Sequence, residues 1–265
     1  MHTFNYHRPD TAKKAAALLA KKDTKALAGG QTLLPALKLR LASVDNLVDL
    51  GAVKGLGDIA QKSKNVVLGA MARHADVATS SIVKKAIPAL AKLAEAIGDP
   101  HVRNVGTIGG SLANNDPSAD YPAAVLALNA TVVTNKRKIP ADKFFKGLFD
   151  TALGKGEFIV QVVFPVVKRA AYAKFPNPAS RFAMVGVFVA DHGKEIRVAV
   201  TGASEDGVYR AKDMEAALKK NFSANSLDGI KVPGKGIMSD IHADAQYRAH
   251  LVGVMAKRAV AAASG

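Results

Sequence analysis

The chain carries Ala28-Gly29-Gly30-Gln31-Thr32 and Asn104-Val105-Gly106-Thr107-Ile108-Gly109-Gly110-Ser111, two stretches in which adjacent glycines lie beside small hydroxyl residues. Backbone N–H groups reach a bulky, doubly charged diphosphate only where no Cβ intervenes, and glycines with positive φ turn successive N–H groups inward as an anion nest. Hydroxyls donate to the remaining phosphate oxygens. Either stretch alone is also compatible with an ordinary tight turn. Two of them favour a diphosphate-binding site.

Other nucleotide-binding motifs are absent or poorly formed. The sequence contains no G-x-x-x-x-G-K-[ST], which argues against a P-loop enzyme. Gly55-Leu56-Gly57-Asp58-Ile59-Ala60 fits the letters of the dinucleotide pattern G-x-G-x-x-A. A polar segment follows it instead of the long apolar helix that a Rossmann unit requires, so we interpret it as a chance match.

Around the glycines, the pattern predicts mixed α and β structure. In the first 55 residues we expect a helix over 11–22 that Asp10 caps, a strand over 26–28, a helix over 33–41 and a strand over 46–50. Next we expect strands at 66–69, 131–134 and 157–164, helices near 88–97 and 122–128, and a glycine-rich loop from 106 to about 120. For the last part of the chain we expect a hairpin (182–190 and 195–201), a helix over 247–258 and a frayed tail at 259–265.

Composition excludes several classes of protein. The 265 residues suffice for one large domain or two to three small ones, and no run of about 18 apolar residues predicts a membrane helix. The absence of cysteine excludes disulfides, cysteine nucleophiles and Fe–S ligation within the chain. The first residues lack the layout of a signal peptide, so we expect a cytoplasmic protein.

The net charge of +15 raises the alternative of a basic nucleic-acid or anion-binding module. The lysines occur in scattered pairs such as Lys13-Lys14 and Lys84-Lys85, however, and no aromatic residues interleave with them to stack bases. We therefore expect no nucleic acid partner. The basic surface also suits an acidic partner subunit.

Two long motifs, AGGQTLLPALKLRLASVDNLVDL (28–50) and RNVGTIGGSLANNDPSADYPAAVLALNA (103–130), resemble the FAD-binding medium subunit of the molybdenum hydroxylases. This family includes carbon monoxide dehydrogenase and bacterial xanthine dehydrogenase. A third stretch, YAKFPNPASRFAMVGVFVA (172–190), resembles the opening of that family's C-terminal domain. The likeness covers nearly the whole chain.

The resemblance implies an α+β architecture with an FAD-binding fold of the p-cresol-methylhydroxylase type. Two α/β subdomains, 1–55 and 56–170, would clasp the cofactor, and a C-terminal α+β domain would comprise 171–265. Residues matching the family's FAD contacts are Ala28, Gly29, Gly30, Gln31, Thr32, Leu33, Thr107, Ile108, Gly109, Gly110, Ser111, Asn114, Asp120, Ile159 and Lys174. Of these, Asn114 and Asp120 match positions along the ribityl and adenosine portions. Leu33, Ile159 and Lys174 match positions near the flavin ring.

Plainer roles remain open for several of these residues. Asp120 also suits a helix N-cap before Tyr121, and Lys174 also suits a solvated surface lysine. His74 and His101 are interpreted as loop or partly buried histidines, not ligands. No pairing of carboxylates, histidines or serine predicts a metal site or hydrolysis.

In function, the resemblance implies an oxidoreductase subunit that passes electrons from Fe–S centres through FAD to an external acceptor. The implied partners are a small 2Fe-2S subunit and a large molybdopterin subunit in a dimer of heterotrimers, through which the complex could also reach the inner face of the membrane. A stand-alone FAD oxidoreductase is the alternative within the flavoproteins.

Overall fold

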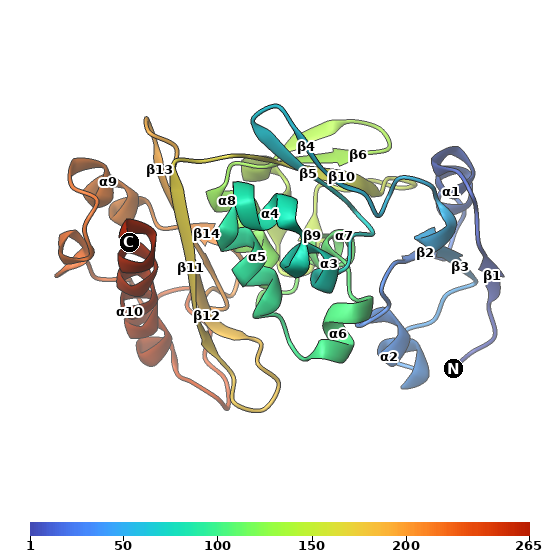
Figure 1. The fold of residues 1–265 in the computed structure, drawn as a ribbon. Helices are drawn as coiled ribbons and strands as arrows, with labels where there is room; N and C mark the ends of the chain where they lie inside the picture. Colours follow the sequence, from blue (N-terminus) through green and yellow to red (C-terminus); the bar gives the residue numbers. More distant parts are fainter.

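The computed structural model describes residues 1–265 and arranges three sheet-containing units in a row. Figure 1 shows the N-terminal unit at one end, the C-terminal unit at the other, and the glycine-rich middle unit between them. The mixed helix-and-strand architecture predicted from the sequence is confirmed. The limits 1–55, 56–170 and 171–265 of the three units stay a prediction. In the structure, the strand β10 of the middle unit ends at Pro165, and the strand β11 of the C-terminal unit begins at Arg169.

The N-terminal unit is a three-stranded parallel sheet in the order β1-β3-β2. Its elements are β1 (Asn5–His7), α1 (Ala12–Leu19), β2 (Thr24–Leu27), α2 (Leu33–Lys38) and β3 (Asn46–Asp49). Its apolar core brings Ala15 and Leu19 of α1 onto Val48 of β3, and Phe158 from much later in the chain completes it. The unit therefore does not bury its core with its own residues alone.

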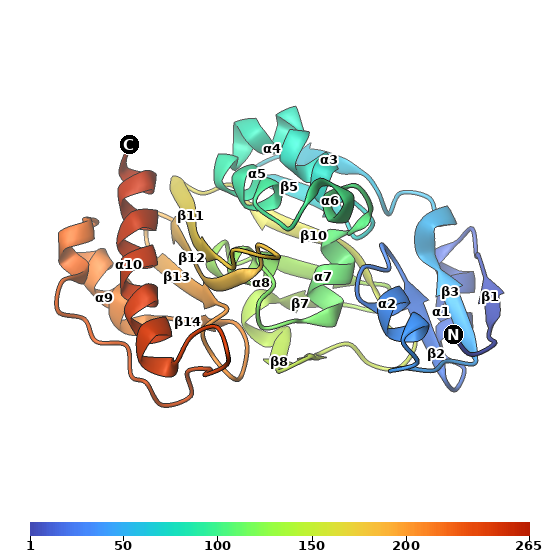
Figure 2. The ribbon, with the colours of Figure 1, turned by 90° about the horizontal axis from the view of Figure 1, so that it is seen from below.

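The middle unit is a five-stranded antiparallel sheet in the order β4-β5-β10-β6-β7, packed against helices. Its strands are β4 (Ile59–Lys62), β5 (Asn65–Gly69), β6 (Thr131–Thr134), β7 (Lys138–Pro140) and β10 (Ile159–Pro165), with a small hairpin of β8 (Phe145–Gly147) and β9 (Asp150–Thr151). The helices are α3 (His74–Thr79), α4 (Ser81–Ala86), α5 (Pro88–Glu95), α6 (Pro100–Val105), α7 (Ile108–Asn114) and α8 (Tyr121–Ala127). β10, the last of these five strands in the sequence, lies at the centre of the sheet (Figure 2).

The C-terminal unit is a four-stranded antiparallel sheet in the order β11-β12-β13-β14. Its elements are β11 (Arg169–Pro176), β12 (Ala183–Asp191), β13 (Ile196–Thr201), β14 (Tyr209–Arg210), α9 (Lys212–Lys220) and α10 (Ala245–Ser264). All nine residues of β12 are buried. Side chains of a strand point alternately to the two faces. Val187 accordingly packs with α10, whereas Phe188 packs in the core of the middle unit.

Several sequence expectations were wrong in detail. Thr11, not Asp10, caps α1 by accepting from the Lys14 N–H, while Asp10 pairs with the Lys14 ammonium at 2.8 Å. The expected loop from 106 to 120 contains helix α7. The C-terminal tail is not frayed, because α10 continues to Ser264 and its residues Ala259 and Val260 are buried. No helix is long and apolar enough to cross a bilayer.

Arg248 of α10 is 1% exposed and joins that helix to the sheet. Its guanidinium donates to the carbonyls of Met184 and Gly202 at 2.7 and 2.8 Å and to Asp240 at 2.6 Å. Removing one partner from a buried polar cluster leaves the others unpaired. We expect Arg248→Met to lower the free energy of unfolding by about 2–4 kcal/mol in urea titrations. Arg258→Met, at an exposed position of the same helix, is the control and should change it little.

Candidate functional site

The two glycine-rich stretches, far apart in sequence, contact each other at the junction of the N-terminal and middle units. A Cβ built on Gly29 would overlap the carbonyl oxygen of Val105 and lie 2.7 Å from the Gly106 Cα. A Cβ built on Gly110 would lie 3.6 Å from the Cβ of Ala28. The stretches thus form one continuous surface.

The second stretch does not form the anion nest that its glycines predict. Its N–H groups from Ile108 to Ser111 are already used. Ile108 donates to Ala72 O at 3.1 Å, Gly109 to Ala70 O at 2.8 Å, Gly110 to the Thr107 hydroxyl at 3.1 Å and Ser111 to Thr107 O at 3.0 Å. Gly109 and Gly110 also lie within α7, without positive φ. This stretch offers hydroxyls, a close approach and the single unused N–H of Thr107, but no run of free N–H groups.

The first stretch holds the free donors. Gly30 has a φ of +67°, the left-handed conformation that glycine adopts without strain. The backbone N–H groups of Gly30, Gln31, Thr32 and Leu33 donate to no acceptor of the protein. Gln31 and Thr32 are exposed. Four adjacent unused donors, facing a neighbouring stretch with the hydroxyls of Thr107 and Ser111, fit an anionic group such as a diphosphate.

The remaining predicted contact residues are placed differently. Leu33 is half-buried and packs on the small apolar cluster around Leu37 and Leu47. Asn114 is half-buried at the end of α7. Ile159 is 3% exposed within the core of the middle unit, so its side chain does not reach the surface shared by the glycine stretches. Its role at the flavin stays a prediction.

Asp120 and Lys174 come together in a buried polar cluster between the middle and C-terminal units. The Lys174 ammonium lies 2.9 Å from Asp120 Oδ1 and donates to Ala96 O at 2.8 Å, and the Tyr172 hydroxyl donates to Asp120 Oδ1 at 2.6 Å. The side chains of Asp120 and Lys174 are only 6% and 7% exposed. Asp120 makes no side-chain cap on α8. The simpler roles, helix cap and surface lysine, are therefore wrong.

Burial raises the pKa of Asp120, while Lys174 and the Tyr172 hydroxyl oppose that rise. Burial and the Asp120 charge raise the pKa of Tyr172 well above its usual value, so this side chain stays protonated and donates. The cluster is closed within the protein, since every one of its polar side chains has a partner.

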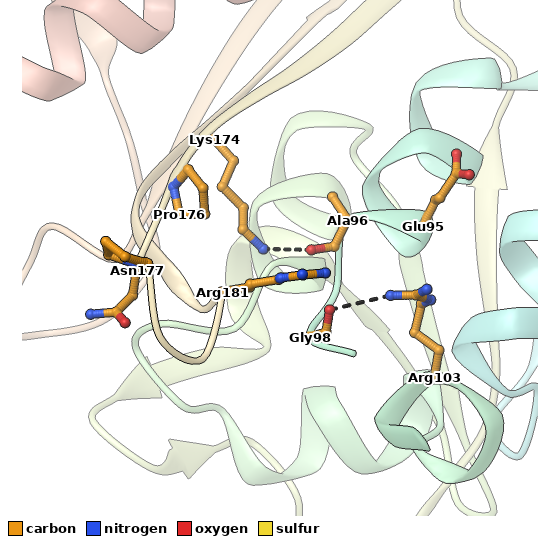
Figure 3. A pocket seen from close by; sticks show the side chains of 9 residues that line it. Glu95, Ala96, Gly98, Arg103, Lys174, Pro176, Asn177 and Arg181 are labelled. Atoms are coloured by element: carbon orange, nitrogen blue, oxygen red, sulfur yellow. Dashed lines mark hydrogen bonds between the residues drawn. The ribbon is translucent and has the colours of Figure 1, made fainter. Parts of the chain in front are cut away.

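Lys174 also forms part of the wall of a cavity of about 420 Å³, drawn in Figure 3. Two guanidinium groups face this space. Arg103 donates to the carbonyls of Ile97 and Gly98, and Arg181 is presented by a turn in which Asn177 accepts from Ala179 and Ser180 N–H groups. Glu95 is the one acidic residue in the lining. The cavity is therefore cationic and suits an anionic or electron-rich group.

Three residues of this region were missed as site residues, although all three lie in quoted motifs. Arg103 opens RNVGTIGGS, whereas Tyr172 and Arg181 lie in YAKFPNPASRF. The signal in the sequence was the motif itself. Nothing in the letters showed that Tyr172 points back to Asp120, because that contact depends on the pairing of β11 with β12.

Behind the junction, His74 is 5% exposed and donates its backbone N–H to Gly106 O at 3.0 Å. A Cβ built on Gly106 would lie 2.7 Å from the His74 Nε2, so the imidazole fills the space behind this glycine. Burial, with a contribution from the Arg103 charge, lowers the pKa of His74 to about 4. The His101 side chain is 97% exposed. Neither belongs to a group of metal-ligating residues.

The fold and the paired glycine stretches define a flavin-binding module, and the comparisons identify its family. Residues 2–167 match the family described as "FAD binding domain in molybdopterin dehydrogenase", and the chain belongs to this family and binds FAD. It is 34% identical to the carbon monoxide dehydrogenase medium chain of Hydrogenophaga pseudoflava, covering 98% of this chain and 96% of that one. The glyceraldehyde dehydrogenase medium chain of Sulfolobus acidocaldarius is also 34% identical, over 92% and 90%.

Solved structures agree with this assignment. A structure of the Hydrogenophaga pseudoflava carbon monoxide dehydrogenase superposes with a TM-score of 0.88 at 36% identity, covering 99% of this chain and 98% of that one. A cyanide-inactivated Cu,Mo-CO dehydrogenase gives 0.90 at 30% identity with the same coverage. The recognition of the family and of FAD from the two glycine motifs is confirmed.

Gly109 is required for packing. A Cβ there would lie 2.6 Å from Ala70 O and 2.7 Å from the Ala70 Cβ, between α7 and the end of β5. We expect Gly109→Ala to lower the free energy of unfolding by about 1–3 kcal/mol because the backbone must shift. Gly253→Ala is the matched control, since this helical glycine has open space around it and alanine favours helix. Equal stability of both variants in urea unfolding would contradict this role.

His74 makes stability depend on pH. The folded protein holds the side chain neutral down to about pH 4, whereas the unfolded chain protonates near 6.5, so unfolding takes up a proton between these values. Stability should be full above about pH 6.5 and decrease by about 3 kcal/mol as the pH falls to 4. In chemical unfolding at several pH values, His74→Leu should flatten this slope. His101→Leu, at an exposed position, should leave the slope as in the wild type.

Proposed function

We propose that this chain is the FAD-binding medium subunit of a molybdenum hydroxylase and passes electrons from Fe–S centres on a partner subunit through FAD to an external acceptor. The observation that carries the proposal is the contact between the two glycine stretches. This contact supports the proposal because the first stretch has four unused N–H donors and the second carries the Thr107 and Ser111 hydroxyls. Bound FAD supplies the redox chemistry, because flavins exchange electrons singly or in pairs.

In this proposal the diphosphate is held by residues 28–32 through their N–H groups and by 107–111 through their hydroxyls. Gly29 and Gly110 keep the approach free of side chains. Asn114 and Asp120 are proposed to line the ribityl and adenosine side, and Leu33, Ile159 and Lys174 the flavin side. No residue of this chain is assigned acid–base catalysis, since the chain's task is to bind, orient and tune the cofactor.

The electron source must lie on another chain. This protein has no cysteine with which to hold an Fe–S cluster. Its relatives are named as medium chains, and a caffeine dehydrogenase relative as a subunit, so they work in complexes with other chains. We propose a small 2Fe-2S subunit and a large molybdopterin subunit as partners, in a dimer of heterotrimers in the cytoplasm. The +15 charge would speed the encounter with acidic partners.

Two alternatives are separated by simple measurements. A stand-alone FAD oxidoreductase would purify without partners and turn over by itself. A nucleic-acid-binding module would be colourless and would bind DNA in a salt-sensitive manner. The visible spectrum of the purified protein decides between flavin and no flavin.

Gly110 tests the diphosphate site. A Cβ here would lie 3.1 Å from the Thr107 hydroxyl oxygen and point toward Ala28, so a larger side chain fills the space between the stretches. We expect Gly110→Val to purify with less than about a tenth of the wild-type flavin, a loss of roughly 1.4 kcal/mol or more in binding. Its circular dichroism should resemble the wild type. Wild-type flavin content would show that this stretch does not face the cofactor.

Reconstitution tests the role as a subunit. The isolated, FAD-loaded chain should show no flavin reduction with any candidate substrate, because it has no centre that oxidises one. Addition of the two partner subunits should restore substrate-dependent reduction, followed as bleaching of the flavin band. Reduction in the verified pure chain alone would favour the stand-alone oxidoreductase.

A further inference from the structure

Tyr172 contributes a buried hydroxyl that the FAD-binding motifs do not account for. It lies in β11 of the C-terminal unit, yet its hydroxyl donates to Asp120, at the start of α8 in the middle unit, at 2.6 Å. Its ring stacks on Phe188 with centroids 6.1 Å apart. Two independent contacts therefore fix this side chain, one through the ring and one through the hydroxyl.

The neighbouring strand makes room for this hydroxyl. A Cβ built on Gly186 would overlap the Tyr172 hydroxyl oxygen and lie 2.9 Å from its Cζ. Gly186 pairs with Lys174 in the β11–β12 register and has no positive φ, so backbone conformation does not call for glycine here. The glycine is needed for the space that the Tyr172 hydroxyl occupies.

Asp120 transmits the position of this hydroxyl to Lys174. Its carboxylate accepts from Tyr172 on Oδ1 and from the Lys174 ammonium, 2.9 Å from Oδ1 and 3.2 Å from Oδ2. The other anchor of the ammonium is the carbonyl of Ala96. Figure 3 shows Lys174 extending along the cavity toward Ala96. Without the Tyr172 hydroxyl, the Asp120 carboxylate loses the hydrogen bond that fixes its orientation. The Lys174 ammonium then has a partner in Asp120 whose position is no longer fixed.

We propose that Tyr172 is a positioning residue for the flavin site, which fixes the Asp120 carboxylate and, through it, holds the Lys174 ammonium at the wall of the cationic cavity. The inference rests on the proposed function, in which Lys174 lies on the flavin side. Gly186 serves the same purpose by leaving space for the hydroxyl. A fixed positive charge near a flavin stabilises its reduced, anionic form, so the placement of Lys174 should tune the reduction potential.

The test uses the full chain loaded with FAD and compares Tyr172→Phe, Lys174→Met and the double variant. Phenylalanine keeps the stacking on Phe188 and removes only the hydroxyl. We expect Tyr172→Phe to weaken FAD binding about fivefold to tenfold, by loss of a hydrogen bond to a charged group, and to lower the midpoint potential. The double variant should match Lys174→Met alone, since Tyr172 acts through Lys174.

Tyr209→Phe is the matched control. Tyr209 is a half-buried tyrosine of the same sheet, and its hydroxyl oxygen is buried without a hydrogen-bond partner. Its replacement should leave FAD affinity and potential unchanged. If Tyr172→Phe folds poorly by circular dichroism, Gly186→Ala tests the same point, because it retains the hydroxyl and displaces it from Asp120.

The outcomes separate this inference from the function on which it rests. A Tyr172→Phe protein with altered melting temperature but wild-type FAD affinity and potential would overturn the positioning role alone. Fully additive effects of Tyr172→Phe and Lys174→Met would overturn the route through Lys174. A wild-type chain that binds no FAD would overturn the proposed function, and the inference with it.

Discussion

No side chain fits between the backbone of Gly29 and the carbonyl of Val105, and the candidate site depends on this close approach. It brings the turn after β2 of the N-terminal unit onto the segment between α6 and α7 of the middle unit. Donors from one and hydroxyls from the other then share a surface. Gly106 and Gly109 extend the same constraint inward, against His74 and Ala70. The site therefore depends first on the close packing of two backbone segments, and any contacts to a ligand depend on that packing.

Much of the fold could be predicted from the sequence because its signals are local. The hairpin of β12 and β13 follows from two apolar runs around Asp191-His192-Gly193, and Pro88 and Pro122 mark the first turns of α5 and α8. The errors arose where tertiary contacts decide. α7 is helical through Gly109 and Gly110, residues that disfavour helix, because Thr107 caps it and β5 packs against it.

The candidate site, like the fold, could be predicted from the sequence only in part. The glycine motifs and the family they indicate were recognisable as strings of residues. Which stretch supplies the free N–H groups was not, since it depends on acceptors such as Ala70 and Ala72 that lie elsewhere in the chain. The partnership of Asp120 with Tyr172 crosses two units and 52 positions of sequence, and no local pattern encodes it.

The central position of β10 and the place of Phe158 govern how this protein can be made. The core of the N-terminal unit includes Phe158, and the middle sheet joins β5 to β6 only through residues 159–165. During synthesis on the ribosome, the first 150 residues therefore emerge with apolar surface that has no permanent cover. Apolar surface that stays exposed during synthesis makes a chain prone to aggregation until it is covered. The flavin site, which needs both units in place, can form only after the strand that closes them has left the exit tunnel.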